Sequence, residues 1–259
     1  MGLLRDAPPT ATLARRIEDA GLNASAPPQQ AFVDGWLLRL SPGKAKRARC
    51  VNALQRGRLP LRDMLARCRA AFASSGLPLI VRITPFTQPV DLDAQLAVFG
   101  WHRFDETRVL ARVRLDDLPP APALLRRVDS AQYAQTVGQL RGSSPEQIAA
   151  HAERLRESRV PYQGYLLEDE KGQLLACGQI ALEDTLAGLY DIFTPPAQRR
   201  RGHARALCLA LLHAAHRQGA RHAYLQVDDG NEAAISLYER LGFQLAYRYH
   251  YRSEVPNVE

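Results

Sequence analysis

The chain has 259 residues, of which 46% are hydrophobic and 24% are charged, and its formal net charge is +7. This length suits two domains of about 100–150 residues each, and the composition is that of a globular protein rather than a disordered chain. No apolar run reaches the ~18–20 residues of a membrane span, and residues 1–22 lack the apolar core and cleavage site of a signal peptide, so a cytoplasmic protein without a membrane segment is expected.

The cysteines argue against a disulfide framework or a metal site. None of them shows CxxC spacing, and each lies in an apolar or helical stretch: Cys50, Cys68, Cys177 and Cys208. We therefore expect buried free thiols and no bound metal. The basic excess favours anionic ligands, but it does not distinguish a nucleic acid from a phosphorylated cofactor.

The first part of the chain alternates strand and helix patterns. Residues 60–76, for example, carry apolar side chains at helical spacing, with Pro60 suited to the first turn and Gly76 to the end of the helix. In chain order the patterns predict a helix over 12–22, strands over 35–41 and 47–54, a helix over 60–76, a strand over 77–85, a helix over 92–101 and a strand over 107–115.

A linker is predicted over residues 116–125, because DDLPPAPALL combines aspartates with prolines. We therefore place one domain at 1–118 and a second at 119–259. In the second domain the patterns predict helices over 129–140 and 144–157, three strands within 164–194, a helix over 202–217, a strand over 222–227, a helix over 232–241 and a strand over 244–252.

The two parts share an order of elements. Each runs strand, strand, helix, strand, helix, strand, and the last helix ends in FGW at Gly100 in the first part and in LGF at Gly242 in the second. This self-similarity indicates a duplicated α/β unit. If the last strand lies at a sheet edge, its segment YRYHYR could pair with a second copy of the chain and form a homodimer.

One segment joins a predicted strand directly to a predicted helix: PPAQRRRGHARAL, residues 195–207. A helix N-terminus offers unpaired backbone N–H groups and a partial positive charge, and Gly202 lets a ligand approach the backbone closely. Together these features suit a phosphate or pyrophosphate. A solvated basic turn is the alternative, whereas a nucleic-acid surface is not expected, because no aromatic residues alternate with the arginines.

A second segment, NEAAISLYERLGF at 231–243, gives the first one a specific meaning. Arg199-x-x-Gly202-x-Ala204 after a strand, followed by Asn231 and by Tyr238-x-x-x-Gly242, resembles the motifs of the GNAT superfamily of N-acetyltransferases. The match covers roughly residues 124–252. More loosely, residues 1–118 resemble the first half of tandem GNAT-like proteins.

The resemblance implies an α/β (α+β) fold with two mixed, mostly antiparallel sheets flanked by helices. The second domain would be catalytic. The first would be a degenerate copy, because Leu96 and Pro89 stand where the second domain has Tyr238 and Asn231.

Acetyl-CoA is the cofactor that the resemblance implies. Its pantetheine arm would lie beside Ile192, Phe193 and Thr194, where the sheet would splay between strands 189–194 and 222–227. Its pyrophosphate would lie on the amides around Gly202. The implied contacts in this loop are Arg199, Arg200, Arg201, Gly202, His203, Ala204 and Arg205, and Asn231 is either a further contact or only a helix N-cap.

The resemblance also implies direct attack of an amine on the thioester, without an acyl-enzyme. Tyr238 matches the acid that protonates the leaving thiolate, and packing in the core is its structural alternative. Gln226 stands where many relatives have a glutamate and cannot act as a base, so Asp191 and Asp228 are the candidate bases. A backbone N–H near Phe193 is a candidate oxyanion donor.

The implied function is transfer of an acetyl group from acetyl-CoA to a primary amine of an unidentified small molecule, peptide or protein. The alternative is a non-catalytic sensor that binds acyl-CoA, which the substitution at Gln226 keeps open.

Overall fold

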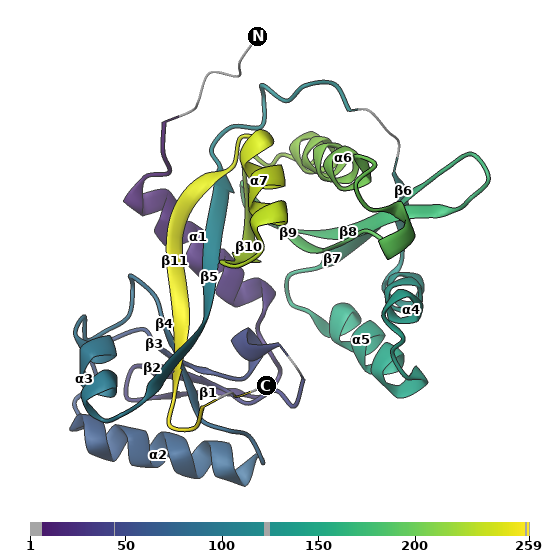
Figure 1. Ribbon diagram of the computed structural model, residues 1–259. Helices are drawn as coiled ribbons and strands as arrows, with labels where there is room; N and C mark the ends of the chain where they lie inside the picture. Colours follow the sequence, from purple (N-terminus) through teal and green to yellow (C-terminus); the bar gives the residue numbers. More distant parts are fainter. Residues whose placement is uncertain (1–6, 44, 122–124, 257, 259) are drawn as a thin grey trace. The chain divides into compact units, whose positions relative to one another are not determined.

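The structure is a computed structural model that describes residues 7–43, 45–121, 125–256 and 258 (Figure 1). It divides into two compact units, each discontinuous in the sequence. Unit 1 comprises Met1–Ala24, Leu110–Gln226 and Glu232–Ala246, and unit 2 comprises Ser25–Val109, Val227–Asn231 and Tyr247–Glu259. Within the described ranges, no helix has the length and apolar character needed to cross a membrane.

Unit 1 contains a mixed sheet whose strands follow the order β11-β5-β10-β9-β8-β7-β6. Strand β10 pairs with β9 in parallel, while β9, β8, β7 and β6 are antiparallel neighbours. The elements are α1 (Ala11–Ala24), the end of β5 (His102–Arg112), β6 (Arg126–Val128), α4 (Ser130–Arg141), α5 (Pro145–Glu157), β7 (Tyr162–Glu168), β8 (Leu174–Glu183), β9 (Leu186–Phe193), the 3-10 turn η2 (Pro196–Gln198), α6 (His203–Arg217), β10 (His222–Asp228), α7 (Glu232–Arg240) and the start of β11 (Gln244–Ser253).

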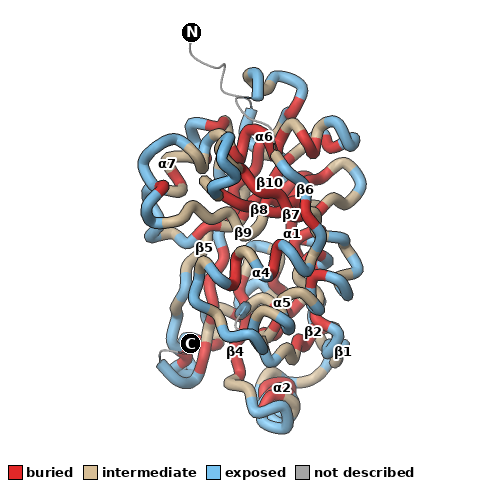
Figure 2. Tube along the Cα trace, turned by 90° about the vertical axis from the view of Figure 1, so that its right-hand side faces the viewer, coloured by how far each residue is buried: buried red, intermediate tan, exposed pale blue. Residues whose placement is uncertain are grey.

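Helices cover both faces of this sheet. Gly178 of β8 lies against α6, because a Cβ atom at this glycine would come within 3.4 Å of Leu207 and Leu211 side-chain atoms. Gly164 of β7 lies against α4, where a Cβ atom would clash with the ring of Tyr133. The two glycines therefore let the two helices approach the sheet closely, and the strands between them are buried along most of their length (Figure 2).

Helix α1 belongs to unit 1 although it opens the sequence. Arg16 forms a 3.0 Å ion pair with Asp184 in the β8–β9 turn, and Asn23 donates a 2.8 Å hydrogen bond to Glu183. The hydroxyl of Tyr162 donates to the carbonyl of Ala24 at 2.8 Å. These contacts attach the first helix to the β7–β9 part of the second half of the sequence.

Unit 2 repeats the helix-on-sheet arrangement, with strand order β1-β2-β3-β4-β11-β5. Helices α2 and α3 pack Phe72, Leu92 and Leu96 against Trp36 and Val81 of the sheet. The elements are β1 (Gln30–Val33), β2 (Trp36–Arg39), the 3-10 turn η1 (Lys46–Ala48), β3 (Val51–Ala53), α2 (Leu61–Ser74), β4 (Ile80–Ile83), α3 (Leu92–Val98), the first part of β5 and the last part of β11.

The last strand of each sequence half pairs with the other half. Strand β11 pairs with β4, from His250↔Ile83 to Ser253↔Ile80. Strand β5 lies beside β10, and the carbonyl of Val113, just after β5, lies 2.6 Å from Nδ1 of His222. Both β5 and β11 thus contribute residues to both units, so the compact units do not follow a single cut in the sequence. The division at 118/119 remains a prediction about the repeat.

The expectation that the last strand lies at a sheet edge is wrong. Strand β11 has β4 on one side and β5 on the other, so its backbone groups are engaged on both sides. The segment YRYHYR therefore offers no free edge for a second copy of the chain. The homodimer itself stays a prediction.

The other sequence predictions of regular structure largely agree with the fold. The mixed, mostly antiparallel sheets flanked by helices are confirmed, and so are the four free, buried cysteines. The short strands β1 and β6 were not predicted, and β5 begins at His102 rather than at 107. Residues 116–121 and 125 of the predicted linker have no regular structure, and 122–124 lie outside the described residues.

A buried arginine joins the exchanged strand β5 to helix α7 in unit 1. Arg112 is 2% exposed; it donates to the carbonyl of Leu241, and its Nη2 lies 2.6 Å from a carboxylate oxygen of Asp117. Its Nε donates to the carbonyl of Arg114 at 2.9 Å. A Cβ atom at Gly242 would collide with this guanidinium, so the glycine after α7 makes room for it.

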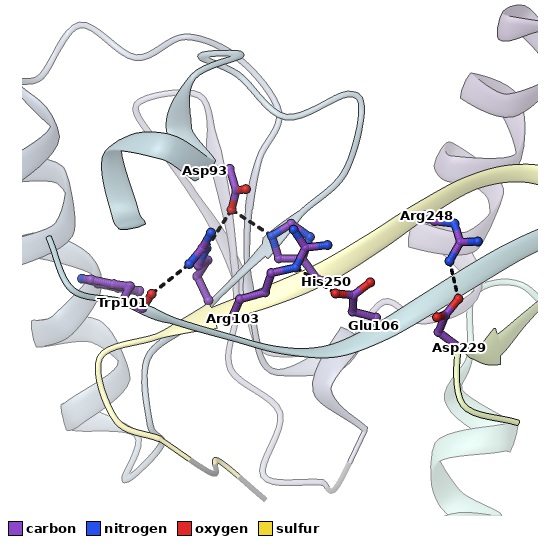
Figure 3. A network of polar contacts seen from close by, with 8 residues as sticks. Asp93, Trp101, Arg103, Glu106, Asp229, Arg248 and His250 are labelled. Carbon is purple, nitrogen blue, oxygen red and sulfur yellow. Dashed lines mark hydrogen bonds and ion pairs between the residues drawn. The ribbon is translucent and has the colours of Figure 1, made fainter. Parts of the chain in front are cut away.

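Unit 2 has a comparable brace between β11 and α3 (Figure 3). Asp93 accepts from Arg252 at 2.7 Å and lies 2.8 Å from Nε2 of His250, while Arg252 also donates to the carbonyl of Trp101 at 2.9 Å. Burial alone would raise the pKa of Asp93, but the hydrogen bonds from Arg252 and His250 outweigh it and leave the pKa below its usual value. The carboxylate therefore stays charged and holds the start of α3 against β11.

We expect the substitution Arg112→Met to lower the free energy of unfolding by about 3 kcal/mol, because it leaves a carboxylate and a buried carbonyl without their partner. The matched control is Arg114→Gln, which removes an exposed ion pair with Asp116 and should leave the free energy of unfolding nearly unchanged. Urea unfolding measures both. Equal losses in the two variants would contradict the bracing role.

Candidate active site

Strand β9 contains a β-bulge. Its pairing with β8 runs from Gln179↔Tyr190 to Cys177↔Phe193, so the two residues Asp191 and Ile192 stand opposite Gly178 alone. Asp191 has a φ of +53°, in the left-handed region that side chains other than glycine rarely adopt. The extra residue interrupts the β8–β9 ladder and turns backbone groups of β9 away from it.

On its other edge, strand β9 stops pairing with β10 just before the bulge. The parallel pairing with β10 covers His222↔Leu186, Ala223↔Ala187 and Tyr224↔Gly188, and for the described residues it goes no further. Residues 189–193 therefore have a backbone edge that β10 does not occupy, which is the predicted splay. An extended ligand can bind such an edge with main-chain hydrogen bonds.

The loop after β9 leads straight into helix α6. Gly202 precedes the helix with a φ of +86°, and a Cβ atom built there would meet nothing within 4 Å. No side chain caps this N-terminus. The first N–H groups of α6 thus lie at a positive helix end without a side-chain cap, which is the geometry of an anion site.

The three arginines of the loop are exposed, as expected of a charged rim. Arg199 donates to the carbonyl of Thr194 and Arg201 to the side chain of Gln198, both at 3.3 Å, so these two help to shape the loop itself. Arg200 has a φ of +63°, which reverses the chain before Gly202. His203 and Ala204 in the first turn of α6 are half-buried, and Arg205 is exposed.

Tyr238 lies on α7 and is 7% exposed, with its ring in edge-to-face contact with Phe243 at 5.9 Å. Burial raises the pKa of its phenol, and Cys208 of α6 adds a small further rise. Among the described residues no group forms a hydrogen bond with this hydroxyl. The phenol is therefore protonated at neutral pH, and its O–H group is available to donate to a ligand.

Asp191 is held by helix α4. Its carboxylate forms an ion pair with Arg141, and its backbone carbonyl accepts a 3.2 Å hydrogen bond from the hydroxyl of Tyr133. Its second carboxylate oxygen, Oδ2, is buried and has no hydrogen-bond partner in the described structure. A buried oxygen without a donor is costly, so this atom is suited to receive a hydrogen from a ligand.

Asp228 and Asn231 belong to unit 2, where they shape the turn after β10. The carboxylate of Asp228 accepts the N–H of Gly230 at 2.8 Å, and its carbonyl accepts the N–H of Asn231 at 3.0 Å. Asp228 is exposed at the end of its strand. Its carboxylate thus has a structural role in the turn.

The corresponding loop of unit 2, before α2, differs because a carboxylate binds its amides, although α2 also lacks a side-chain cap. Between β3 and α2, Oδ2 of Asp34 accepts the N–H groups of Arg58 and Leu59 at 2.7 and 2.8 Å, and Pro60 precedes α2 without an N–H of its own. The same carboxylate lies 2.5 Å from the Cβ position of Gly57. A carboxylate of the chain therefore occupies two loop amides just before α2.

Sequence reasoning missed the residues of α4 that hold β9. Arg141 and Tyr133 are separated from Asp191 by 50 and 58 positions in the sequence, and no motif links them to it. Gly178 was also missed, although a glycine inside a strand is a signal for a bulge or a close approach. No group of three or more potential metal ligands occurs in the part of the chain that the structure describes.

Comparisons with known proteins place part of the chain among N-acetyltransferases. A model of the acetyltransferase (GNAT) family matches residues 131–243. An uncharacterized N-acetyltransferase of Bacillus subtilis (strain 168), YobR, is 28% identical over 229 residues, which are 86% of this chain and 91% of that protein. The alanine N-acetyltransferase of ribosomal protein bS18 from Escherichia coli (strain K12) is 36% identical over 81 residues, 31% of this chain and 53% of that protein.

Solved structures share the fold. A GCN5-related N-acetyltransferase from Kribbella flavida superposes with a TM-score of 0.70 at 20% identity, over 95% of this chain and 96% of that one. A tandem GNAT protein from the clavulanic acid biosynthesis pathway gives a TM-score of 0.59 at 19% identity, over 76% and 70% of the two chains. Residues 131–243, which carry the bulged strand β9, the open end of α6 and Tyr238, are the part of the chain that matches the GNAT family of acetyltransferases.

Proposed function

We propose that unit 1 transfers an acetyl group from acetyl-CoA to a primary amine by direct attack in a ternary complex. The observation that carries the proposal is the divergence of β10 from β9 after Gly188, directly before the uncapped N-terminus of α6. This arrangement provides a free strand edge followed by an anion site, which is the order of the pantetheine arm and the pyrophosphate in coenzyme A. A cytoplasmic location remains a prediction.

The residues present fit this cosubstrate. The N–H groups from His203 to Arg205 are free of side-chain caps and suit a pyrophosphate. The exposed loop arginines, Arg199, Arg200 and Arg201, add positive charge around it. The edge of β9 at Ile192 and Phe193 suits the amides of the pantetheine arm, and a backbone N–H turned out of the ladder by the bulge suits the developing oxyanion. Asn231 belongs to unit 2 and stays a prediction from the sequence motif.

Acetyl-CoA supplies an activated thioester. In the transfer a C–N bond forms to the amine and the C–S bond breaks, so the amine must lose a proton and the thiolate must gain one. Tyr238 is proposed as the donor to the thiolate, because burial raises the pKa of its phenol and keeps it protonated. No Ser or Cys nucleophile is needed, and the thiols of Cys177 and Cys208 are unsuited to the role, since burial raises the pKa of each to about 12.

Asp191 is the base candidate that the side-chain contacts favour. Its Oδ2 is buried and lacks a donor, whereas the carboxylate of Asp228 is exposed and bonded to Gly230. A protonated amine that donates to Oδ2 would satisfy this oxygen and place its proton on the group that removes it. Neither the fold nor the relatives favour the non-catalytic sensor, and release of free thiol from acetyl-CoA in the presence of amines distinguishes the two functions.

We expect Gly202→Ala to weaken binding of coenzyme A at least about 10-fold, because a methyl group would occupy the open space before the first N–H groups of α6. The matched control is Gly219→Ala at the other end of α6, where φ is +98° and a Cβ atom again meets nothing within 4 Å. Both variants carry a similar backbone cost of about 1 kcal/mol. Calorimetric titration with coenzyme A checks the affinities, and equal affinities in both variants would contradict the anion site.

We expect Tyr238→Phe to lower kcat by about 100-fold or more while the affinity for coenzyme A stays within about 2-fold, because only the proton donor is lost. The control is Tyr165→Phe, which removes a hydroxyl bonded to Gln163 at 2.8 Å elsewhere in unit 1. Thiol release from acetyl-CoA over a panel of primary amines gives kcat. Unchanged turnover in the Tyr238 variant would refute its role as the acid.

A further inference from the structure

Helix α4 contacts the bulge in β9 from one side through Tyr133 and Arg141. The hydroxyl of Tyr133 donates to the carbonyl of Asp191, and Arg141 pairs with the carboxylate of the same residue. The guanidinium of Arg141 also lies over the ring of Phe193, 5.4 Å from its centroid. We name these two side chains the α4 clamp: Tyr133 holds the backbone of the bulge and Arg141 holds its side chain.

The opposite face of the bulge is fixed independently. Ile192 points toward α6, and its Cδ1 lies only 2.6 Å from the position of a Cβ atom at Gly178. Asp191 and Phe193 are thus held by α4 while Ile192 is held by α6. The left-handed φ of Asp191 is unfavourable for a residue with a Cβ atom, and contacts on both faces maintain it.

The clamp leaves one carboxylate oxygen of Asp191 unused. Arg141 engages Oδ1, whereas Oδ2 is buried without a hydrogen-bond partner. A planar guanidinium restricts the rotation of the carboxylate that it binds. The pair therefore fixes the direction in which Oδ2 is presented, next to backbone that lacks its β10 neighbour.

An ordinary role for Arg141 is to place positive charge at the C-terminus of α4, where it is the last helical residue. That role needs no partner on β9. The helix-end role does not explain why Arg141 stacks on Phe193 and pairs with Asp191. These two residues flank Ile192 at the predicted transfer site.

We infer that Arg141 is a positioning residue for the acceptor amine: it orients the carboxylate of Asp191 so that Oδ2 receives the ammonium group of the acceptor and takes its proton. Tyr133 fixes the backbone from which this carboxylate extends. The inference rests on the proposed acetyl transfer and adds the residue that couples the α4–α5 hairpin to the acceptor side of β9.

The test compares Arg141→Gln and Arg141→Lys with the control Arg126→Gln. Arg126 of β6 forms a bidentate ion pair with Glu168 of β7, with both contacts at 2.7 Å. Both strands belong to the same unit as Arg141. With an amine that the wild type acetylates, chosen from putrescine, lysine and benzylamine, Arg141→Gln should lower kcat/KM for the amine at least about 10-fold. KM for acetyl-CoA should change less than about 2-fold. Arg141→Lys should recover part of the loss, because it restores a charge but not the planar fork.

A second rescue separates positioning from folding. In Arg141→Ala, millimolar methylguanidinium should restore part of kcat/KM for the amine, which a misfolded protein would not show. If Arg141→Gln and Arg126→Gln lose the same activity, or if the loss lies in KM for acetyl-CoA, the positioning role is wrong.

Hydrogen exchange tests whether Arg141 holds the bulge in β9, and this measurement needs no amine substrate. Backbone amides of residues 190–193 should exchange faster in Arg141→Gln than in wild type, and the Arg126→Gln control should leave them unchanged. Unchanged exchange in Arg141→Gln overturns the clamp. If the wild type acetylates no amine of the panel, the proposed function fails, and the exchange measurement still decides whether Arg141 holds the bulge.

Discussion

The site depends on one constraint: strand β9 cannot pair fully with both of its neighbours. Strand β10 leaves it after Gly188, and the bulge at Asp191 and Ile192 interrupts its ladder with β8. Both departures occur just before the chain turns into α6. A free strand edge and an open helix N-terminus are therefore produced together, because the same short segment of chain creates them.

The two units of the chain treat the same kind of loop differently. In unit 1 the loop before α6 is built around Gly202 and has no side-chain cap. In unit 2 the carboxylate of Asp34 binds the loop amides before α2, and hydrogen bonding by these amides contributes to a pKa of Asp34 below its usual value. A negative charge thus lies in the loop before α2, whereas the loop before α6 carries three exposed arginines. This contrast supports a single cofactor site in the chain, in unit 1.

The sequence was informative where structure is local. The loop motif, the glycine before α6 and the helix with Tyr238 are read from short spacings, and they lie where the motifs placed them. Strand β11 was misplaced at an edge because its own residues do not reveal its partners; its pairing with β4 joins residues more than 160 positions apart. The contacts of Arg141 and Asp34 were missed for the same reason, since each depends on a partner brought near only by the fold.

We propose that the chain has one acetyl-CoA site, in unit 1. Calorimetric titration of the wild-type chain with coenzyme A tests it most directly, because the stoichiometry is independent of the unidentified acceptor. We expect one coenzyme A molecule to bind per chain. Two bound molecules would show that unit 2 also binds coenzyme A despite the carboxylate of Asp34 in its loop. No binding would contradict the proposed site at α6.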